Sequence, residues 1–340
     1  SYQALQYGLT VNHATMPLPL HRHAALSSSR RFLRQVGNET QTPSLAWVPP
    51  PGEPAGKDPL KYSSSSSSSM PFRDVPRRTS RAAGRLPRVT MEVEALVAQL
   101  LPTEEQLRHR DETVQELRRH VQMSIPGSDL VPFGSAATGL WLPDRDVDLS
   151  LQVSGLQGRI ETKEALRRVA ITIHSFSGEK PENRLSAKMP LLRWVPEYGV
   201  LPSFDITVNN DLAVENSRLV SAYLAAEPLL KPLLLVIKTW ASARKINDRS
   251  QGTLSSFALT LMAVSLLQRK CRLPSLQDLG MLHGEPRREV LNVDCRFCTD
   301  ARIIEAEKLK LAEGSSSGAP NLGAFLLDFF KFFGDEYKGG

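Results

Sequence analysis

The chain is poor in cysteine and in aromatic residues, and it contains no long apolar run. Three cysteines in 340 residues are too few for a disulfide framework, which excludes a small secreted domain held together by cross-links. No segment approaches the roughly 18 consecutive apolar residues of a membrane-spanning helix, so we expect no membrane partner. With 41% hydrophobic residues the chain can still build a sizeable core, and a reducing compartment, the cytoplasm, fits best.

Net positive charge is absent outside the N-terminal region. Of the 42 Lys and Arg residues, 12 fall in residues 1–90, where only 4 acids oppose them. The remainder of the chain therefore has a slight excess of acids, although the whole carries a formal net charge of +6. The net charge is thus no argument for nucleic-acid binding by the folded part.

Residues 1–90 lack a sustained hydrophobic period and are predicted to be a disordered, basic and Ser-rich tail. The serine run 63–69 and the Pro-rich stretch 49–52 support this prediction. The Arg- and Ser-rich run 21–35 has no acid, which is compatible with a mitochondrial transit peptide and makes mitochondria the alternative compartment. We expect the tail to offer contacts for protein partners, and a chain that begins with Ser1 is expected to start upstream or to be processed.

Regular structure is predicted from about Met91. Thr103 and Gln106 form a capping-box pattern, and apolar residues at helical spacing continue to about Met123. Alternation of apolar and polar residues predicts strands at 128–133, 147–151, 185–194 and 202–208, and a longer period predicts helices at 159–174, 216–226, 232–244, 253–270 and 322–333. This order predicts an α+β fold, in which a small mixed sheet adjoins a separate α-helical domain.

The predicted domain boundaries follow from this order of elements. Residues 1–90 form the tail, 91–125 form helices that pack with the helical domain, 126–214 form the sheet domain, and 215–340 form the helical domain.

The pair Asp146 and Asp148 carries the strongest chemical signal. Apolar residues alternate with polar ones from Val147 onward, so the two acids share one face of a strand. Neighbouring carboxylates repel each other, and a cation that prefers oxygen ligands relieves the repulsion; Mg²⁺ fits best, with Mn²⁺ as an alternative. An isolated Asp-x-Asp would simply be solvated, but here an apolar strand follows the pair.

A Gly-Ser turn precedes the acidic pair, with Ser135 eleven positions before Asp146. Gly134 permits a tight turn, and such a turn directs backbone N–H groups and the Ser135 hydroxyl toward an anion. A phosphate-binding turn near a pair of metal-binding carboxylates is the layout of a nucleotidyl-transfer site.

The string FGSAATGLWLPDRDVDL at 133–149 resembles the terminal RNA nucleotidyltransferases. These are the terminal uridylyltransferases and the non-canonical poly(A) polymerases, which belong to the DNA polymerase β-like nucleotidyltransferases. The resemblance covers about residues 100–337 and implies a palm domain followed by a helical domain of the PAP-associated type. Arg145 departs from the family, which usually has a small polar residue before the first Asp.

Asp205 lies on the predicted strand 202–208 between Phe204 and Ile206. A buried Asp on a strand is costly unless it is paired or metal-bound. The family has its third catalytic carboxylate in this setting. The resemblance therefore implies that Asp146, Asp148 and Asp205 are both the catalytic residues and the ligands of two Mg²⁺ ions.

Lys238 follows five apolar residues on a predicted helix, where a lysine needs an anion or a route to solvent. The resemblance implies that it binds the triphosphate. Ser242, one helical turn later, stands where the family often has a second lysine. Arg244 or Lys245 could compensate for the missing charge, although neither is expected on the same face of the helix.

Two further motifs complete the predicted nucleotide site. Asn216 and Ser217 open a predicted helix, so either could be its cap, and the resemblance gives Asn216 the ribose. Ser256 would contact phosphates, and Phe257 would stack on the base where the family has Tyr. The implied nucleotide-binding residues are Gly134, Ser135, Asn216, Ser217, Lys238, Ser242, Ser256 and Phe257.

The resemblance implies a template-independent enzyme that adds nucleotides to RNA 3′ ends from an NTP and releases pyrophosphate. The compact layout between Asp148 and Asp205 favours UTP as the nucleotide. ATP stays the alternative, because the segment that reads the base in the family is expected after Gly340. The departures at Arg145, Ser242 and Phe257 leave a second class open, a catalytically weak RNA-binding scaffold.

Overall fold

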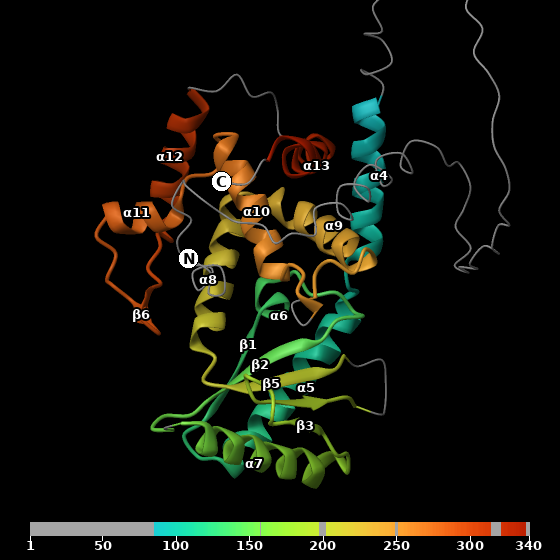
Figure 1. Ribbon diagram of the computed structural model, residues 1–340, viewed down its shortest axis with the longest axis vertical. Coiled ribbons are helices and arrows are strands. Elements are labelled where there is room, and N and C mark those ends of the chain that lie inside the picture. The colour runs from blue at the N-terminus through green and yellow to red at the C-terminus, as the bar shows by residue number, and fades with distance from the viewer. Residues whose placement is uncertain (1–84, 157, 197–201, 249–250, 314–320, 338–340) are drawn as a thin grey trace, which may run out of the picture.

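The computed structural model describes residues 85–156, 158–196, 202–248, 251–313 and 321–337 (Figure 1). The predicted transit run 21–35 and most of the predicted tail lie outside these residues. The tail's contacts with protein partners and the cellular compartment therefore stay predictions. None of the described helices is long and apolar enough to cross a membrane.

Five strands form one mixed sheet in the order β1-β2-β5-β4-β3. They are β1 (Asp129–Phe133), β2 (Val147–Gln152), β3 (Glu182–Arg184), β4 (Leu191–Trp194) and β5 (Phe204–Val208). The central strands β2 and β5 run parallel, whereas the other neighbouring pairs are antiparallel. The predicted mixed sheet is confirmed. Of the strand predicted over 185–194 only β4 forms, because residues 185–189 make turns and bends, one of them closed by the 3.4 Å hydrogen bond from the Ala187 N–H to the Arg184 carbonyl; β3 precedes the predicted range.

Helices α5 (Glu104–Ser124) and α7 (Arg159–Ser177) share a hydrophobic cluster with the sheet. Apolar residues of α5, α7, β2 and β5 are buried together there; among them are Val114, Leu117, Val121, Leu166, Val169, Ile173, Leu149, Leu151 and Ile206. The prediction that residues 91–125 pack with the helical domain is therefore wrong for α5, because its apolar face is buried against α7 and β1.

The capping box predicted at the start of α5 is present. Thr103 Oγ1 accepts a hydrogen bond from the Gln106 N–H, and the Gln106 side chain accepts one from the Thr103 N–H. Two of the backbone donors at the start of the helix are thereby satisfied, which explains why the sequence located this boundary well.

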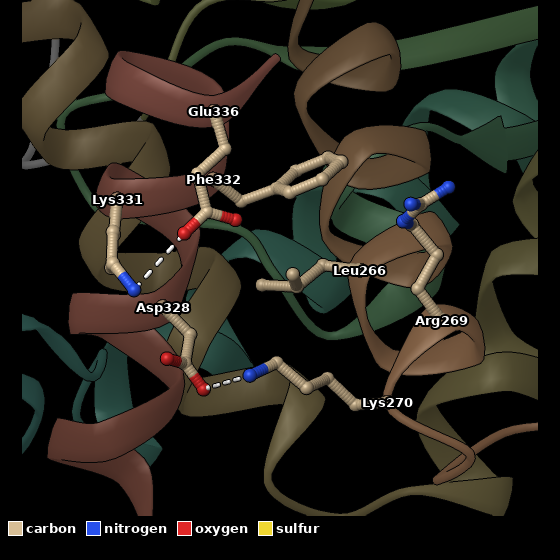
Figure 2. Close-up of a pocket in the computed structure, with 7 residues that line it drawn as sticks. All are labelled: Leu266, Arg269, Lys270, Asp328, Lys331, Phe332 and Glu336. Carbon is tan, nitrogen blue, oxygen red and sulfur yellow. Dashed lines mark ion pairs between the residues drawn. The ribbon is translucent and has the colours of Figure 1, made fainter.

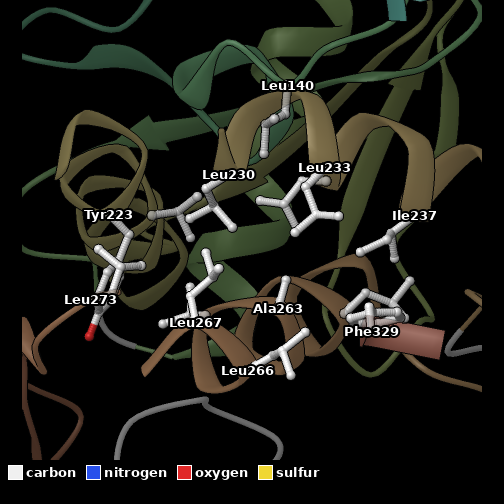
Figure 3. Packing of buried hydrophobic residues seen from close by; sticks show 14 of the residues in the cluster. Leu140, Tyr223, Leu230, Leu233, Ile237, Ala263, Leu266, Leu267, Leu273 and Phe329 are labelled. Atoms are coloured by element: carbon white, nitrogen blue, oxygen red, sulfur yellow. The ribbon is translucent and has the colours of Figure 1, made fainter. Parts of the chain in front are cut away.

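The remaining long helices form a second hydrophobic cluster, which lies above the sheet in Figure 1. They are α4 (Arg85–Leu100), α8 (Asp211–Ala226), α9 (Leu230–Ala243), α10 (Ser256–Arg269), α11 (Leu276–Leu282), α12 (Ala301–Glu313) and α13 (Leu322–Lys331), which continues into the π-helical turn η2 (Phe332–Glu336). Figure 3 shows α9 facing α10, with Leu233 and Ile237 on one side and Ala263 on the other. Strands β6 (Glu289–Val290) and β7 (Val293–Asp294) form a small hairpin.

Helix α4 begins at Arg85, whereas the sequence predicts a tail up to residue 90. Val93 is buried in the second cluster, and Val89 and Leu96 pack against it. Contacts with α9 and α13 thus stabilise a helical turn that carries no strong start signal of its own.

One short segment belongs to both hydrophobic clusters. Leu140 and Leu142 are buried in the helical cluster, whereas Trp141 between them is buried in the sheet cluster. Figure 3 shows Leu140 reaching toward Leu230 and Leu233 of α9. The chain between α6 (Ser135–Thr138) and β2 therefore joins the two cores through alternate side chains.

The contact between α4 and α13 requires glycine at position 323. A Cβ atom there would lie 2.5 Å from Thr90 Oγ1 and 2.9 Å from the Thr90 backbone nitrogen. Thr90 Oγ1 already lies 2.9 Å from the Leu86 carbonyl oxygen and 2.8 Å from Asn321 Oδ1, so it has little freedom to move away.

We expect Gly323→Ala to lower the free energy of unfolding by about 1–3 kcal/mol through overpacking. The sign is opposite to the usual gain of about 1 kcal/mol for alanine over glycine in a helix. Thermal unfolding measures the effect, and Gly334→Ala is the matched control, since no atom lies within 4 Å of a Cβ added there. A Gly323→Ala protein that melts at or above the wild-type temperature would contradict this account.

Candidate active site

The parallel pairing of β2 and β5 brings the predicted carboxylates together. Asp148 is directly opposite Asp205 in the register, and Asp146 immediately precedes β2. Val147 and Leu149 point into the sheet core and are fully buried, so Asp148 between them lies on the other face. Their roles stay predictions, but their shared position is a property of the fold.

Arg193 of β4 contacts two of these carboxylates. Its Nη2 lies 2.6 Å from Asp146 Oδ1, and its Nη1 lies 3.4 Å from Asp205 Oδ1. Arg193 and Asp205 are partners in the β4–β5 register, and Ser203 Oγ also contacts Asp146. Sequence reasoning missed Arg193, although a cation between the apolar residues Leu192 and Trp194 on a strand was an available signal.

The carboxylates remain electrostatically strained despite Arg193. Burial raises the pKa of Asp148 to about 7, and the charges of Asp205 and Asp146 add to the effect, while Lys238 and Arg193 oppose it. Burial also raises the pKa of Asp205, with Arg193 opposing and Asp146 adding to the shift. The three neighbouring carboxylates therefore carry more negative charge than Arg193 and Lys238 balance.

This donor set fits Mg²⁺ by its chemistry. Hard carboxylate oxygens suit Mg²⁺, which binds through one or two carboxylates and fills its other positions with water and substrate phosphates. Among the described residues, no group of three or more His, Cys, Asp or Glu side chains is arranged as a complete metal cage. The guanidinium of Arg193 lies against Asp146 and Asp205, so a cation that binds these two carboxylates would compete with it.

Gly134 makes a close approach to Asp148 that only glycine allows. Its φ is +64°, and an added Cβ would lie 2.8 Å from Asp148 Oδ2. The Gly134 N–H donates to Ser217 Oγ at 2.7 Å, and Ser217 Oγ donates to the Ala213 carbonyl at 2.7 Å. Ser135 begins the four-residue helix α6 directly after this turn.

Ser217 Oγ joins the turn to α8. Its hydroxyl donates to the Ala213 carbonyl and its oxygen accepts from the Gly134 N–H, so Ser217 supports the turn; its contact with a nucleotide stays a prediction. It is buried inside α8, which begins five residues before Asn216. Neither Asn216 nor Ser217 is therefore the helix cap considered from the sequence.

Asn216 keeps an unsatisfied polar atom. Its Oδ1 is buried and has no hydrogen-bond partner among the described residues. A buried acceptor without a partner costs free energy, so such an atom is expected to find a water or a ligand. This observation fits the contact to a nucleotide that the resemblance implies.

The predicted phosphate-binding cation, Lys238, is held close to the carboxylates. Burial lowers its pKa to about 8, the charge of Arg145 lowers it further, and Asp148 opposes the shift. Its Nζ donates to the Leu140 carbonyl at 3.4 Å. Ser242 on the same helix accepts a hydrogen bond of 2.6 Å from Arg145 Nη2.

Ser256 and Phe257 lie apart from this network of contacts. The side chain that caps α10 is that of Ser255, which accepts from the Ala258 N–H at 3.0 Å. Phe257 is half-buried against the helical cluster. No hydrogen bond or ion pair between described residues connects either predicted residue with the carboxylates, so their nucleotide contacts stay predictions.

A hollow of about 190 Å³ lies between the end of α10 and α13 (Figure 2). The ion pair Lys270–Asp328, at 2.8 Å, joins the end of α10 to α13, whereas Lys331–Glu336, at 3.0 Å, lies on the α13 side alone. None of the predicted site residues lines it; the lining consists of Leu266, Arg269, Lys270, Asp328, Lys331, Phe332 and Glu336. Its two acids, Asp328 and Glu336, are paired with lysines, and the hollow is not lined by Asp146, Asp148 or Asp205.

Known proteins similar to this chain include poly(A) RNA polymerases. Residues 89–225 match the family model of the central palm domain of mitochondrial-like poly(A) RNA polymerases. Poly(A) RNA polymerase GLD2 of Homo sapiens is 30% identical over 233 residues, which is 65% of this chain and 46% of the relative. The Mus musculus protein is 30% identical over 282 residues, or 78% and 55%. The chain thus spans about half the length of these relatives.

Uridylyl-transferring proteins are also similar. Terminal uridylyltransferase 7 of Homo sapiens is 30% identical over 186 residues, which is 53% of this chain and 12% of that protein. A solved structure of Cid1, described as an RNA terminal uridylyl transferase, has a TM-score of 0.62 at 23% identity and covers 74% of this chain and 71% of its own. The family model and the curated relatives confirm the resemblance: this chain belongs to the terminal RNA nucleotidyltransferases, the family of non-canonical poly(A) and poly(U) polymerases among the DNA polymerase β-like nucleotidyltransferases.

Proposed function

We propose that the protein adds nucleotides from an NTP to the 3′ end of RNA without a template and releases pyrophosphate. The observation that carries the proposal is the pairing of Asp148 with Asp205 across the parallel central strands, with Asp146 beside them. Relatives named poly(A) RNA polymerase and terminal uridylyltransferase support it. The chain spans about half of the GLD2 relatives, so the activity in their names is carried over to this chain as a proposal.

The residues of the site have separate tasks in this reaction. The three carboxylates would hold Mg²⁺, or Mn²⁺ as an alternative, which when bound neutralises phosphate charge and lowers the pKa of the RNA 3′-hydroxyl. Asp205, whose pKa is raised by burial, accepts the hydroxyl proton as the 3′-oxygen bonds to the α-phosphorus. The bond from the α-phosphorus to the bridging oxygen breaks, and the charge of Lys238 stabilises the departing pyrophosphate.

For the nucleotide we propose ATP, with UTP as the alternative that the sequence favours. The GLD2 relatives match up to 78% of the chain, whereas terminal uridylyltransferase 7 matches 53% at the same identity. Stacking on Phe257 is compatible with either base, because every base presents a π-face. The choice between ATP and UTP therefore depends on hydrogen bonds to the edge of the base and not on stacking.

A primer-extension assay tests the activity and the nucleotide together. A short RNA is incubated with the full chain, Mg²⁺ and each of the four NTPs in separate reactions. We expect a ladder of products with ATP; a ladder with UTP alone would reverse the choice of nucleotide and leave the reaction intact. No product with any NTP would contradict the proposed enzyme.

The ion pairs of Arg193 favour one alternative function, a catalytically weak RNA-binding scaffold. A guanidinium that stays on Asp146 and Asp205 would compete with a catalytic cation. The same assay separates the two functions when RNA binding is measured beside it. A scaffold would bind the RNA and leave its length unchanged with every NTP.

Lys238 predicts a pH dependence of nucleotide binding. Burial and the charge of Arg145 lower its pKa to about 8, so the ammonium is present below that pH and is lost above it. We expect the KM for the NTP to rise as the pH increases from about 7 to about 9, by about tenfold for the loss of one charged contact. Steady-state extension rates measure this, and Lys238→Arg is the control, since guanidinium keeps its charge throughout. An alkaline rise that persists in Lys238→Arg would assign it to another group.

A further inference from the structure

Two departures from the family pattern, Arg145 and Ser242, contact each other. Arg145 Nη2 donates to Ser242 Oγ at 2.6 Å, across 97 positions of sequence. Arg244 and Lys245, the replacement cations considered from the sequence, lie beyond the end of α9 at Ala243. The hydrogen bond instead brings the guanidinium of Arg145, from the turn before Asp146, to Ser242 on α9.

The backbone of Arg145 is held firmly enough to aim this side chain. The buried indole of Trp141 donates from Nε1 to the Arg145 carbonyl at 2.9 Å. The Arg145 N–H donates in turn to the Leu142 carbonyl at 3.0 Å. Because Trp141 and Leu142 are anchored in different hydrophobic clusters, the turn before Asp146 has few alternative conformations.

This arrangement places two cations beside each other. Ser242 lies one helical turn after Lys238 on α9, so the guanidinium bound to Ser242 lies on the face that carries the ammonium. The acid that pairs with Arg145 is Asp144 at 3.3 Å, and both side chains are largely exposed, so this pair holds the guanidinium weakly. Neighbouring like charges are unfavourable alone and favourable around an anion of higher charge.

We propose that Arg145 is a phosphate-binding residue that supplies the second cation of the polyphosphate site, with Ser242 as its anchor. The proposal rests on the proposed function, because the ligand class is the β- and γ-phosphates of the incoming NTP. Arg145 binds them from the side of the carboxylate strand and Lys238 binds them from α9. The positive charge that a lysine at position 242 of α9 would supply is thus supplied by Arg145 from the turn before β2.

Binding of ATP, UTP and AMP to the full chain, without RNA and with Mg²⁺, tests this residue by calorimetry. We expect Arg145→Gln to weaken binding of the triphosphate by about tenfold, the loss typical of one charge-assisted contact, and to leave AMP binding within about twofold. Lys245→Gln, which removes a neighbouring exposed charge, is the matched control and should bind like the wild type. Ser242→Ala keeps the charge and should lose only about threefold.

A rescue variant makes the test independent of folding defects. Arg145→Gln combined with Ser242→Lys returns a cation to α9 and is expected to recover triphosphate binding to within about threefold of the wild type. Wild-type affinity in Arg145→Gln, or equal losses for ATP and AMP, would overturn the proposal for Arg145 alone. A wild-type protein that binds neither ATP nor UTP would overturn the proposed function as well.

Discussion

Asp148→Asn is expected to reduce nucleotide addition by about a thousandfold. The substitution keeps the size of the side chain but removes the charge from the centre of the carboxylate group, opposite Asp205. Loss of a metal-binding carboxylate removes several kcal/mol of charge stabilisation, which corresponds to a factor of this order. Primer extension over a long time course measures the residual rate.

The same substitution is expected to raise the melting temperature of the protein in EDTA by several degrees at neutral pH. The folded state raises the pKa of Asp148 from 3.8 to about 7, so it binds a proton more tightly than the unfolded chain does between these values. Stability contributed by the protonated form is therefore present at low pH and is lost as the pH rises from about 4 to about 7. The asparagine of the variant does not titrate, and melting curves across this range measure the difference.

The matched control is Asp211→Asn, which removes an exposed carboxylate at the start of α8. It should change neither the extension rate nor the pH dependence of melting. Extension by Asp148→Asn within about tenfold of the wild type would remove this carboxylate from the catalytic group.

Gly134→Ala is expected to lower activity by about a hundredfold and to destabilise the sheet domain. A Cβ at this position would lie 2.8 Å from Asp148 Oδ2, and the backbone has φ +64° and ψ −139°, a region that side chains avoid. The backbone strain alone is on the order of 1–3 kcal/mol. The carboxylate must also move, and a displacement of about 1 Å in an active site costs roughly a hundredfold.

Gly178→Ala separates the two contributions. Gly178 ends α7 with φ +78°, and no atom lies within 4 Å of a Cβ added there. It should therefore lower the melting temperature and leave the extension rate unchanged. If both variants lost stability and activity in the same proportion, the loss at Gly134 would reflect unfolding and not the position of Asp148.

Local patterns were sufficient to place the carboxylates. The alternation around Asp148 and around Asp205 predicted both strands and the face that each acid occupies, because a strand has a strict period of two. The start of α8 was misplaced for an equally local reason: Asn216 and Ser217 have the residue types of a helix cap, but Asn210 occupies the cap position and makes no side-chain capping bond.

Contacts between distant elements were not accessible in the same way. Arg193 meets Asp146 only because β4 and β2 both flank the strand β5, and strand order is a property of the whole sheet. Ser217 supports Gly134 from a position 83 residues away, and Arg145 meets Ser242 across 97 residues. A residue's type and spacing identify it as a candidate, whereas its partner depends on how the elements are packed.

The alternation of Leu140, Trp141 and Leu142 between two cores has a consequence for cooperativity. The sheet core and the helical core are separate hydrophobic units, and the turn before Asp146 is attached to both through consecutive side chains. Loosening of either unit would therefore be transmitted to the turn that carries Arg145 and Asp146 before the other unit melts. A ligand that contacts both Lys238 and the carboxylates would act as a cross-link between the units, so nucleotide binding should merge their unfolding into one sharper transition.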